Sequence, residues 1–164
     1  MPDRWHDRLR MRARFRRSAQ VNRATPHMRD FAKSLIAVEE KAHRASRTRP
    51  LAGFYVCEKL RPPLATLMGN AGFHALMSRA LLLAQGEVPW LKSVRVNADG
   101  SFEGLAELDR QLGPQEIAEG RIVLLAQLLG LLVAFIGEDL TMRLTREIWP
   151  SLVFEDMNSS RRPR

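Results

Sequence analysis

The longest hydrophobic stretch of the chain lies in its last third. Residues 121–149 read RIVLLAQLLGLLVAFIGEDLTMRLTREIW, and the first half of this stretch is apolar on every face whereas the second half is amphipathic. A helix without a polar side has to be covered all round. We therefore predict a long helix that is opened by Pro114, kinked at Gly137 and placed at the centre of the molecule. Trp149 and Pro150 are expected to close the structured region.

The apolar part of this stretch is short for a membrane span. Residues 122–136 are apolar except for Gln127, and these fifteen residues extend about 22 Å as a helix, against roughly 30 Å of hydrocarbon in a bilayer. Arg121 precedes them and Glu138 follows them, so a longer span would carry charge into lipid. We predict the core helix of a water-soluble protein, with a membrane-embedded segment as the alternative.

Small residues recur along one side of this helix. Ala126, Gly130 and Ala134 are spaced four residues apart, and Gly137 lies close to the same line. Such spacing leaves a groove into which another helix can approach closely. We expect the partner to be another helix of the same chain, with the same helix of a second subunit as the alternative.

Capping residues and three-and-four spacing predict a first helix well before this one. Thr25 and Pro26 read as its N-cap and first residue, and it is expected to end before Pro50. The residues expected on its buried face are Met28, Phe31, Ala32, Leu35, Val38 and Ala42.

Proline and glycine divide the middle of the chain. A short helix over 51–60 is expected to stop at the prolines of 62–63, with one further turn through Met68. A helix over 71–85 then ends at Gly86. The residues expected on the buried face of this helix are Phe73, Leu76, Met77, Ala80, Leu81 and Ala84.

One short segment favours a sheet. Residues 93–104 read SVRVNADGSFEG, in which two valines alternate with polar residues and an Asp-Gly pair at 99–100 signals a turn. An isolated hairpin is marginally stable, so we expect Phe102 and Trp90 to anchor it on the helices. A short helix over 105–112 follows. The predicted fold class is all-α, a bundle of about five helices with a small hairpin near 93–104.

Size and composition favour one domain in a reducing compartment. The 164 residues are 45% hydrophobic, which suffices for a single core. Cys57 is the single cysteine, so an internal disulfide is excluded, and we interpret it as a small buried hydrophobe and not as a nucleophile. The N-terminus has no continuous apolar run of the signal-peptide type, and a cytoplasmic location is expected.

Positive charge is concentrated at the N-terminus. Residues 1–50 carry 14 Lys and Arg against 5 acids, a net charge of +9, whereas residues 51–164 carry 12 against 13, a net charge of −1. We therefore expect a basic tail, or a start assigned too early, over 1–27, a single helical domain over 28–154, and a second tail over 155–164.

The arginines of this basic segment suggest a nucleic-acid contact as an alternative to a solvated tail. Guanidinium groups bind phosphate in a bidentate manner, and Trp5 and Phe15 can stack on bases or enter a lipid headgroup layer. The arginines concerned are Arg8, Arg10, Arg12, Arg14, Arg16 and Arg17. Met28 offers a later start for translation, which would remove this nucleic-acid interface altogether.

Motifs that carry catalysis or bind metal are absent from the sequence. The chain has no phosphate loop, no nucleophile elbow, no H-E-x-x-H and no paired C-x-x-C. Glu40 and His43 have the spacing of half a di-iron site, but no second Glu-x-x-His accompanies them. We interpret His74 as a surface histidine. No catalytic, cofactor-binding or metal-binding residue is assigned, and an enzyme is the less favoured class.

The charged residues that follow the apolar helix are expected to form core ion pairs. Glu138 and Asp139 come directly after it, and we expect them to pair with Arg79 or Arg143. A catalytic site around Glu138 is the less favoured reading of the same carboxylates.

Two stretches of the chain resemble a group of small uncharacterised bacterial proteins. They are VCEKLRPPLATLMGNAGFHALMSRALLLA over 56–84 and QLLGLLVAFIGEDLTMRLTREIWP over 127–150. The resemblance covers roughly 56–150 and brings no activity with it. It implies that the folded unit begins after Met28 and that the helices holding Arg79 and Glu138 share one core.

Together these patterns predict a helical interaction or regulatory module whose partner is a protein, most simply a second copy of the chain. The first alternative is a nucleic-acid-associated protein that binds phosphates through residues 1–27, and its binding would weaken steeply with salt. The second alternative is a small membrane-associated protein.

Overall fold

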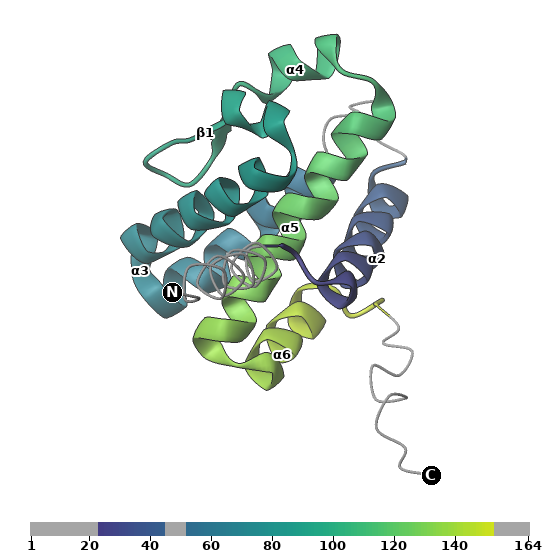
Figure 1. The fold of residues 1–164 in the computed structure, drawn as a ribbon. Coiled ribbons are helices and arrows are strands. Elements are labelled where there is room, and N and C mark those ends of the chain that lie inside the picture. Colours follow the sequence, from purple (N-terminus) through teal and green to yellow (C-terminus); the bar gives the residue numbers. More distant parts are fainter. Residues whose placement is uncertain (1–22, 45–51, 153–164) are drawn as a thin grey trace, which may run out of the picture.

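The structure is a computed structural model that describes residues 23–44 and 52–152 (Figure 1). Its elements are, in chain order, α2 (Pro26–His43), α3 (Ala52–Glu87), the 3-10 helix η1 (Pro89–Ser93), β1 (Arg95–Val96), β2 (Phe102–Glu103), α4 (Leu105–Gln111), α5 (Pro114–Ile136) and α6 (Glu138–Ile148). The described part of the chain is all-α with one small hairpin, which confirms the predicted fold class.

The central helix is α5. It packs against α2, α3 and α6, and in Figure 1 it runs through the middle of the molecule with α2 on one side and α3 on the other. Every residue from 123 to 129 is buried, and each buried leucine contributes roughly 1.5–3 kcal/mol. The prediction that protein surrounds the apolar helix is therefore confirmed for this segment.

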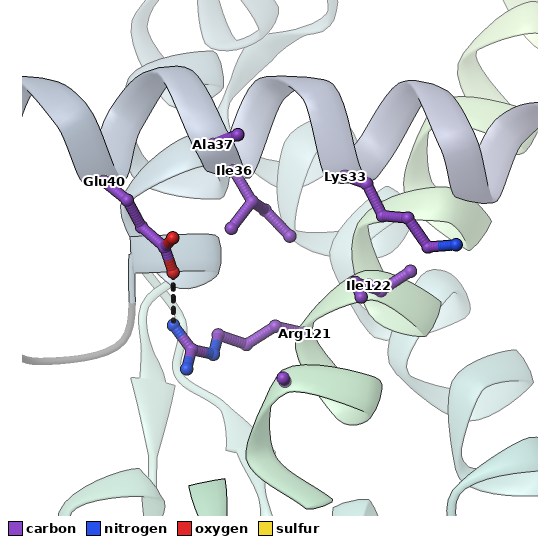
Figure 2. Close-up of a pocket in the computed structure, with 7 residues that line it drawn as sticks. Lys33, Ile36, Ala37, Glu40, Arg121 and Ile122 are labelled. Atoms are coloured by element: carbon purple, nitrogen blue, oxygen red, sulfur yellow. Dashed lines mark ion pairs between the residues drawn. The ribbon is translucent and has the colours of Figure 1, made fainter. Parts of the chain in front are cut away.

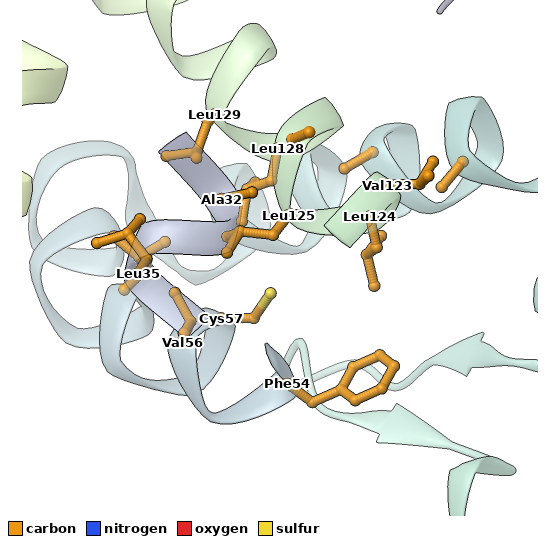
Figure 3. Close-up of a cluster of buried hydrophobic side chains, with 14 of the residues drawn as sticks. Ala32, Leu35, Phe54, Val56, Cys57, Val123, Leu124, Leu125, Leu128 and Leu129 are labelled. Carbon is orange, nitrogen blue, oxygen red and sulfur yellow. The ribbon is translucent and has the colours of Figure 1, made fainter. Parts of the chain in front are cut away.

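Side chains of three helices meet around the buried part of α5 (Figure 3). The labelled contributors are Ala32 and Leu35 from α2, Phe54, Val56 and Cys57 from α3, and Val123, Leu124, Leu125, Leu128 and Leu129 from α5. One continuous core therefore joins these helices.

The first described helix, α2, begins as its capping residues predict. Thr25 has extended backbone, and its Oγ1 accepts a hydrogen bond of 3.2 Å from the backbone N–H of Met28. Pro26 is the first helical residue and His43 the last.

The last turns of α2 differ from the prediction. Val38 is partly buried and Ala42 is exposed, so the buried face expected at Ala42 is wrong. Glu39 occupies that face instead and is 0% exposed. It continues the spacing of Ala32 and Leu35, which places a carboxylate inside the core.

The predicted stop at the prolines of α3 is also wrong. The helix continues through Pro62 and Pro63 and breaks at Gly69, which has φ 78° and ψ 166°. A proline inside a helix costs about 3 kcal/mol. Leu60 and Leu64 flank the prolines and are 0% exposed, so their burial offsets that cost. Only glycine adopts the backbone of Gly69 without strain, and the chain therefore bends there.

The second half of α3 buries the face that its sequence predicts. The residues buried there are Phe73, Met77, Ala80, Leu81 and Ala84. Leu76 is partly buried and packs against the same core.

The hairpin forms where it was predicted. Arg95 pairs with Glu103 and Val96 with Phe102 in antiparallel register. The Phe102 ring packs edge-on against Phe54 of α3, with ring centroids 5.3 Å apart. This contact holds the hairpin on the helices.

Trp90 attaches η1 to α5, whereas the sequence placed it under the hairpin. Its ring covers Gly120 so closely that a Cβ there would lie 2.1 Å from Cζ2 of the indole. Its Nε1–H donates a 3.3 Å hydrogen bond to the carbonyl of Glu116. Glycine at position 120 is therefore a packing requirement.

The predicted kink at Gly137 is a break between two helices. Gly137 has φ 89° and ψ 159°, and it separates α5 from α6. The residues that α6 buries are Thr141, Met142 and Thr145. Trp149, which follows α6, is also buried.

Candidate functional site

The Glu39 carboxylate is buried, and three side chains contact it. Its Oε1 accepts a hydrogen bond from the indole Nε1 of Trp149 at 2.5 Å and another from the Lys59 ammonium. Its Oε2 lies 3.1 Å from Nε2 of His43. Burial acts to raise the pKa of Glu39, but Lys59, Trp149 and His43 outweigh it and hold that pKa below its ordinary value.

This Glu39 network joins three parts of the fold. Glu39 and His43 belong to α2, Lys59 to α3, and Trp149 follows α6. The His43 ring also stacks on Tyr55, with centroids 5.1 Å apart. Both carboxylate oxygens are engaged, so the arrangement serves to fix the helices and leaves no free oxygen for acid–base chemistry.

A second carboxylate, that of Glu87, gathers partners at the end of α3. It accepts hydrogen bonds from the backbone N–H of Ala24 at 2.8 Å, from Arg29 at 2.5 Å and from the side-chain amide of Gln127 at 2.6 Å. Arg29 also reaches Glu119 at 2.8 Å. Gln127, the polar residue within the apolar stretch, is therefore satisfied by Glu87.

A concave site lies between α2 and the first half of α5. Its cavity measures about 200 Å³, and Figure 2 shows α2 passing over α5 with the side chains of both helices directed into the gap. The lining residues are Lys33, Ile36, Ala37, Glu40, Ala118, Arg121 and Ile122. The floor is aliphatic, and charged groups stand at the ends of the site.

Arg121 is the distinctive group of this α2–α5 pocket. Its side chain is 16% exposed, and its Nη1 lies 3.8 Å from Oε1 of Glu40, which is beyond hydrogen-bond distance. Its Nε is buried and has no hydrogen-bond partner. Burial lowers the pKa of Arg121, against the opposing effect of Glu40 and Asp109. The guanidinium is thus a largely buried cation whose charge and N–H donors are only partly compensated.

Of the small residues predicted to form a packing groove, some lie in the core and others lie at the surface. Ala126 is buried in the core, whereas Ala134 and Gly137 are exposed. A Cβ built on Gly130 would meet no atom within 4 Å. Among the described residues no helix fills the groove beyond Ala126, so packing within this part of the chain accounts for the first part of the groove alone.

The expected core ion pairs do not form. Arg79, Glu138, Asp139 and Arg143 are exposed, and Arg143 pairs with Glu147 at 3.4 Å instead of with Asp139. The reason is the orientation of α6, which turns its threonines and Met142 inward and its charges outward. These four residues do not converge on a site within the described part of the chain.

The structure does not bring together the other residues considered for metal binding or catalysis. Glu40 lies near Arg121 while His43 pairs with Glu39, so the Glu40 and His43 side chains do not converge on one point. Residues 23–44 and 52–152 contain no group of three His, Cys, Asp or Glu side chains placed to hold a metal ion. Cys57 is 2% exposed, and burial, with a smaller effect of Glu58, raises its pKa to about 12.

The arginines proposed to bind nucleic acid lie outside the described residues. They are Arg8, Arg10, Arg12, Arg14, Arg16 and Arg17. The described ranges contain 14 Lys and Arg against 14 Asp and Glu, a formal net charge of zero. The positive excess of the chain therefore belongs entirely to the segments around the helical part.

Within residues 23–44 and 52–152, α5 is the one helix long and apolar enough to cross a membrane by length and composition, and 50% of its most apolar window is buried in the protein. The core helix of a water-soluble protein meets the same criterion.

No family model matches the chain, and no curated protein or solved structure matches it either. The resemblance of residues 56–150 to small bacterial proteins stays a prediction.

Proposed function

We propose that this protein is a helical interaction module that associates with a second copy of itself through one face of α5. This open face consists of the exposed Ala134 and Phe135 together with the partly buried Gly130 and Leu131. They share one side of the helix because residues three and four apart are neighbours. The observation that carries the proposal is the exposure of Phe135, which is 71% accessible although it belongs to the most apolar helix of the chain. Exposed apolar residues that adjoin on one face, here Ala134 and Phe135, are typical of an association site.

The shape of the open face favours a second copy as the partner. Phe135 projects at one edge, and an empty space stands above Gly130 at the other edge. In a two-fold interface each surface meets itself, so a projecting side chain and a position without a side chain on the same patch can complement one another twice. A two-fold axis that passes through the open face between Gly130 and Phe135 places Phe135 of each copy over Gly130 of the other. The residues involved are apolar, so no charge has to be buried.

The oligomeric state of the full chain tests this proposal. The chain has a mass of 18.7 kDa, and light scattering after size exclusion should report twice that mass and a return to the monomer on dilution. Phe135→Ser should leave a folded monomer because it removes the projecting ring. Gly130→Leu should do the same by placing a side chain in the space above the glycine, where a Cβ would meet no atom within 4 Å.

Leu82→Ser provides the matched control, because Leu82 is 59% exposed and lies on α3 outside the open face. This variant should remain a dimer. A wild-type chain that stays monomeric at high concentration would refute the proposal, and so would a Phe135→Ser variant that keeps the wild-type mass. Recovery of the wild-type protein only from detergent-extracted membranes would also overturn it, in favour of membrane association. A cytoplasmic location is part of the proposal.

A further inference from the structure

The pocket between α2 and α5 contains a cation whose bonding is incomplete. Glu40 is the nearest carboxylate to Arg121, and their 3.8 Å separation makes an ion pair without a hydrogen bond. A guanidinium offers five N–H donors, and the buried Nε of Arg121 has no acceptor. Buried polar groups in folded proteins are almost always hydrogen-bonded. The Arg121 side chain is 16% exposed and lines the cavity, so an acceptor from outside can reach its guanidinium there.

The rest of the pocket lining indicates the chemical nature of the ligand that supplies this acceptor. Between Arg121 and Lys33 the lining is aliphatic, from Ile36 and Ala37 above and Ile122 below (Figure 2). A cavity of about 150 Å³ is large enough for benzene, and this one measures about 200 Å³. Inorganic phosphate would need several more donors and would leave the aliphatic lining unused.

We propose that this pocket binds a small organic anion, a monocarboxylate with an apolar body, whose carboxylate pairs with the Arg121 guanidinium. The apolar body lies between Ile36 and Ile122. Lys33 stands at the far end, where its 57% exposed side chain pairs with Asp30 at 3.4 Å, so Arg121 is the cation that receives the carboxylate. Glu40 competes with the ligand for Arg121, since both are carboxylates. The site uses the first half of α5 and is independent of the self-association proposed for the second half.

Titration of the full chain with benzoate tests the inference. Calorimetry or amide NMR shifts should show saturable binding of benzoate, and benzyl alcohol and sulfate should each bind more weakly, because one lacks the charge and the other the apolar body. Arg121→Gln should weaken benzoate about tenfold or more, which is the usual effect of losing a charged hydrogen bond. Glu40→Gln should strengthen it by removing the competing carboxylate.

Two further variants keep the test decisive if the Arg121→Gln variant fails to fold. Ala37→Leu changes an exposed residue of the lining and should abolish binding by filling the pocket. Arg110→Gln removes an arginine that is 80% exposed on α4 and should leave benzoate binding unchanged. The inference is overturned by absence of saturable benzoate binding, by equal binding in Ala37→Leu, or by sulfate binding as tightly as benzoate.

Discussion

The indole nitrogen of Trp149 donates a hydrogen bond of 2.5 Å to the carboxylate of Glu39, across 110 residues of sequence. Lys59 holds the same carboxylate oxygen from α3. A single buried acid thereby ties α2, α3 and the segment after α6 together. Because each of its partners would lose an acceptor if Glu39 were absent, we expect the loss of this residue to destabilise the contacts among these three segments.

Glu39→Ala should lower the free energy of unfolding by about 3 kcal/mol, since it leaves the buried Trp149 N–H unpaired and opens a cavity. Urea denaturation measures this change. The matched variant Glu107→Ala removes a carboxylate that is 67% exposed on α4, and it should change stability by less than about 0.5 kcal/mol. Equal losses in the two variants would show that the Glu39 network does not stabilise the fold.

The same network makes stability depend on pH in the acid range. The folded protein holds the pKa of Glu39 below its ordinary value of 4.5, so the unfolded chain binds this proton more readily. The contribution is complete above the ordinary pKa and is lost as the pH falls through the folded value. Urea midpoints should therefore decline on acidification below 4.5. The decline should be smaller in Glu39→Gln, and identical pH profiles would contradict this assignment.

Most of the helices could be predicted from local rules, because capping and periodicity act over a few residues. Thr25 caps α2 as its position in the sequence suggests, and Gly137, where a kink was predicted, has a positive φ and separates α5 from α6. The prolines at 62–63 misled the prediction because burial of their neighbours outweighs a local cost. Tertiary packing overrides local preference there, and no pattern within a short window contains that information.

The polar networks and the pocket could not be predicted, because they depend on residues distant in sequence. Glu39 lies next to Val38, which the apolar pattern placed in the core. The signal that could have indicated its burial was its helical spacing from Ala32 and Leu35. Its partner Trp149 is unrelated to it in sequence. The same holds for Arg121 and Glu40, whose proximity follows from how α2 crosses α5.

Gly69→Ala should destabilise the protein by about 1–3 kcal/mol, because φ 78° and ψ 166° strain any residue with a side chain. A Cβ at this position would meet no atom within 4 Å, so the loss would come from the backbone alone. Gly86→Ala is the control, since its surroundings are equally open and its φ is not positive. Alanine there should stabilise the helix end by about 0.5 kcal/mol. Thermal unfolding of both variants measures the difference, and equal shifts would exclude backbone strain at Gly69.

Cys57 should resist alkylation in the folded protein. Its thiol is 2% exposed, and burial raises its pKa to about 12, so little thiolate is present and reagents cannot reach it. Mass spectrometry after iodoacetamide treatment should find the native chain unlabelled and the urea-unfolded chain labelled once. Rapid labelling of the native protein would mean that the contact between α3 and the core opens readily.

Gly120 and Gly130 lie on the same helix, and alanine should have opposite effects at the two positions. At Gly120 the new Cβ would lie 2.1 Å from the Trp90 ring, so the indole would have to move away from α5. That overpacking should cost about 1–3 kcal/mol. At Gly130 the space is empty, and alanine should stabilise the helix by about 0.5–1 kcal/mol. Chemical unfolding at dilutions where the chain is monomeric measures both changes, and a loss of stability in Gly130→Ala would mean that this part of α5 is covered within the chain itself.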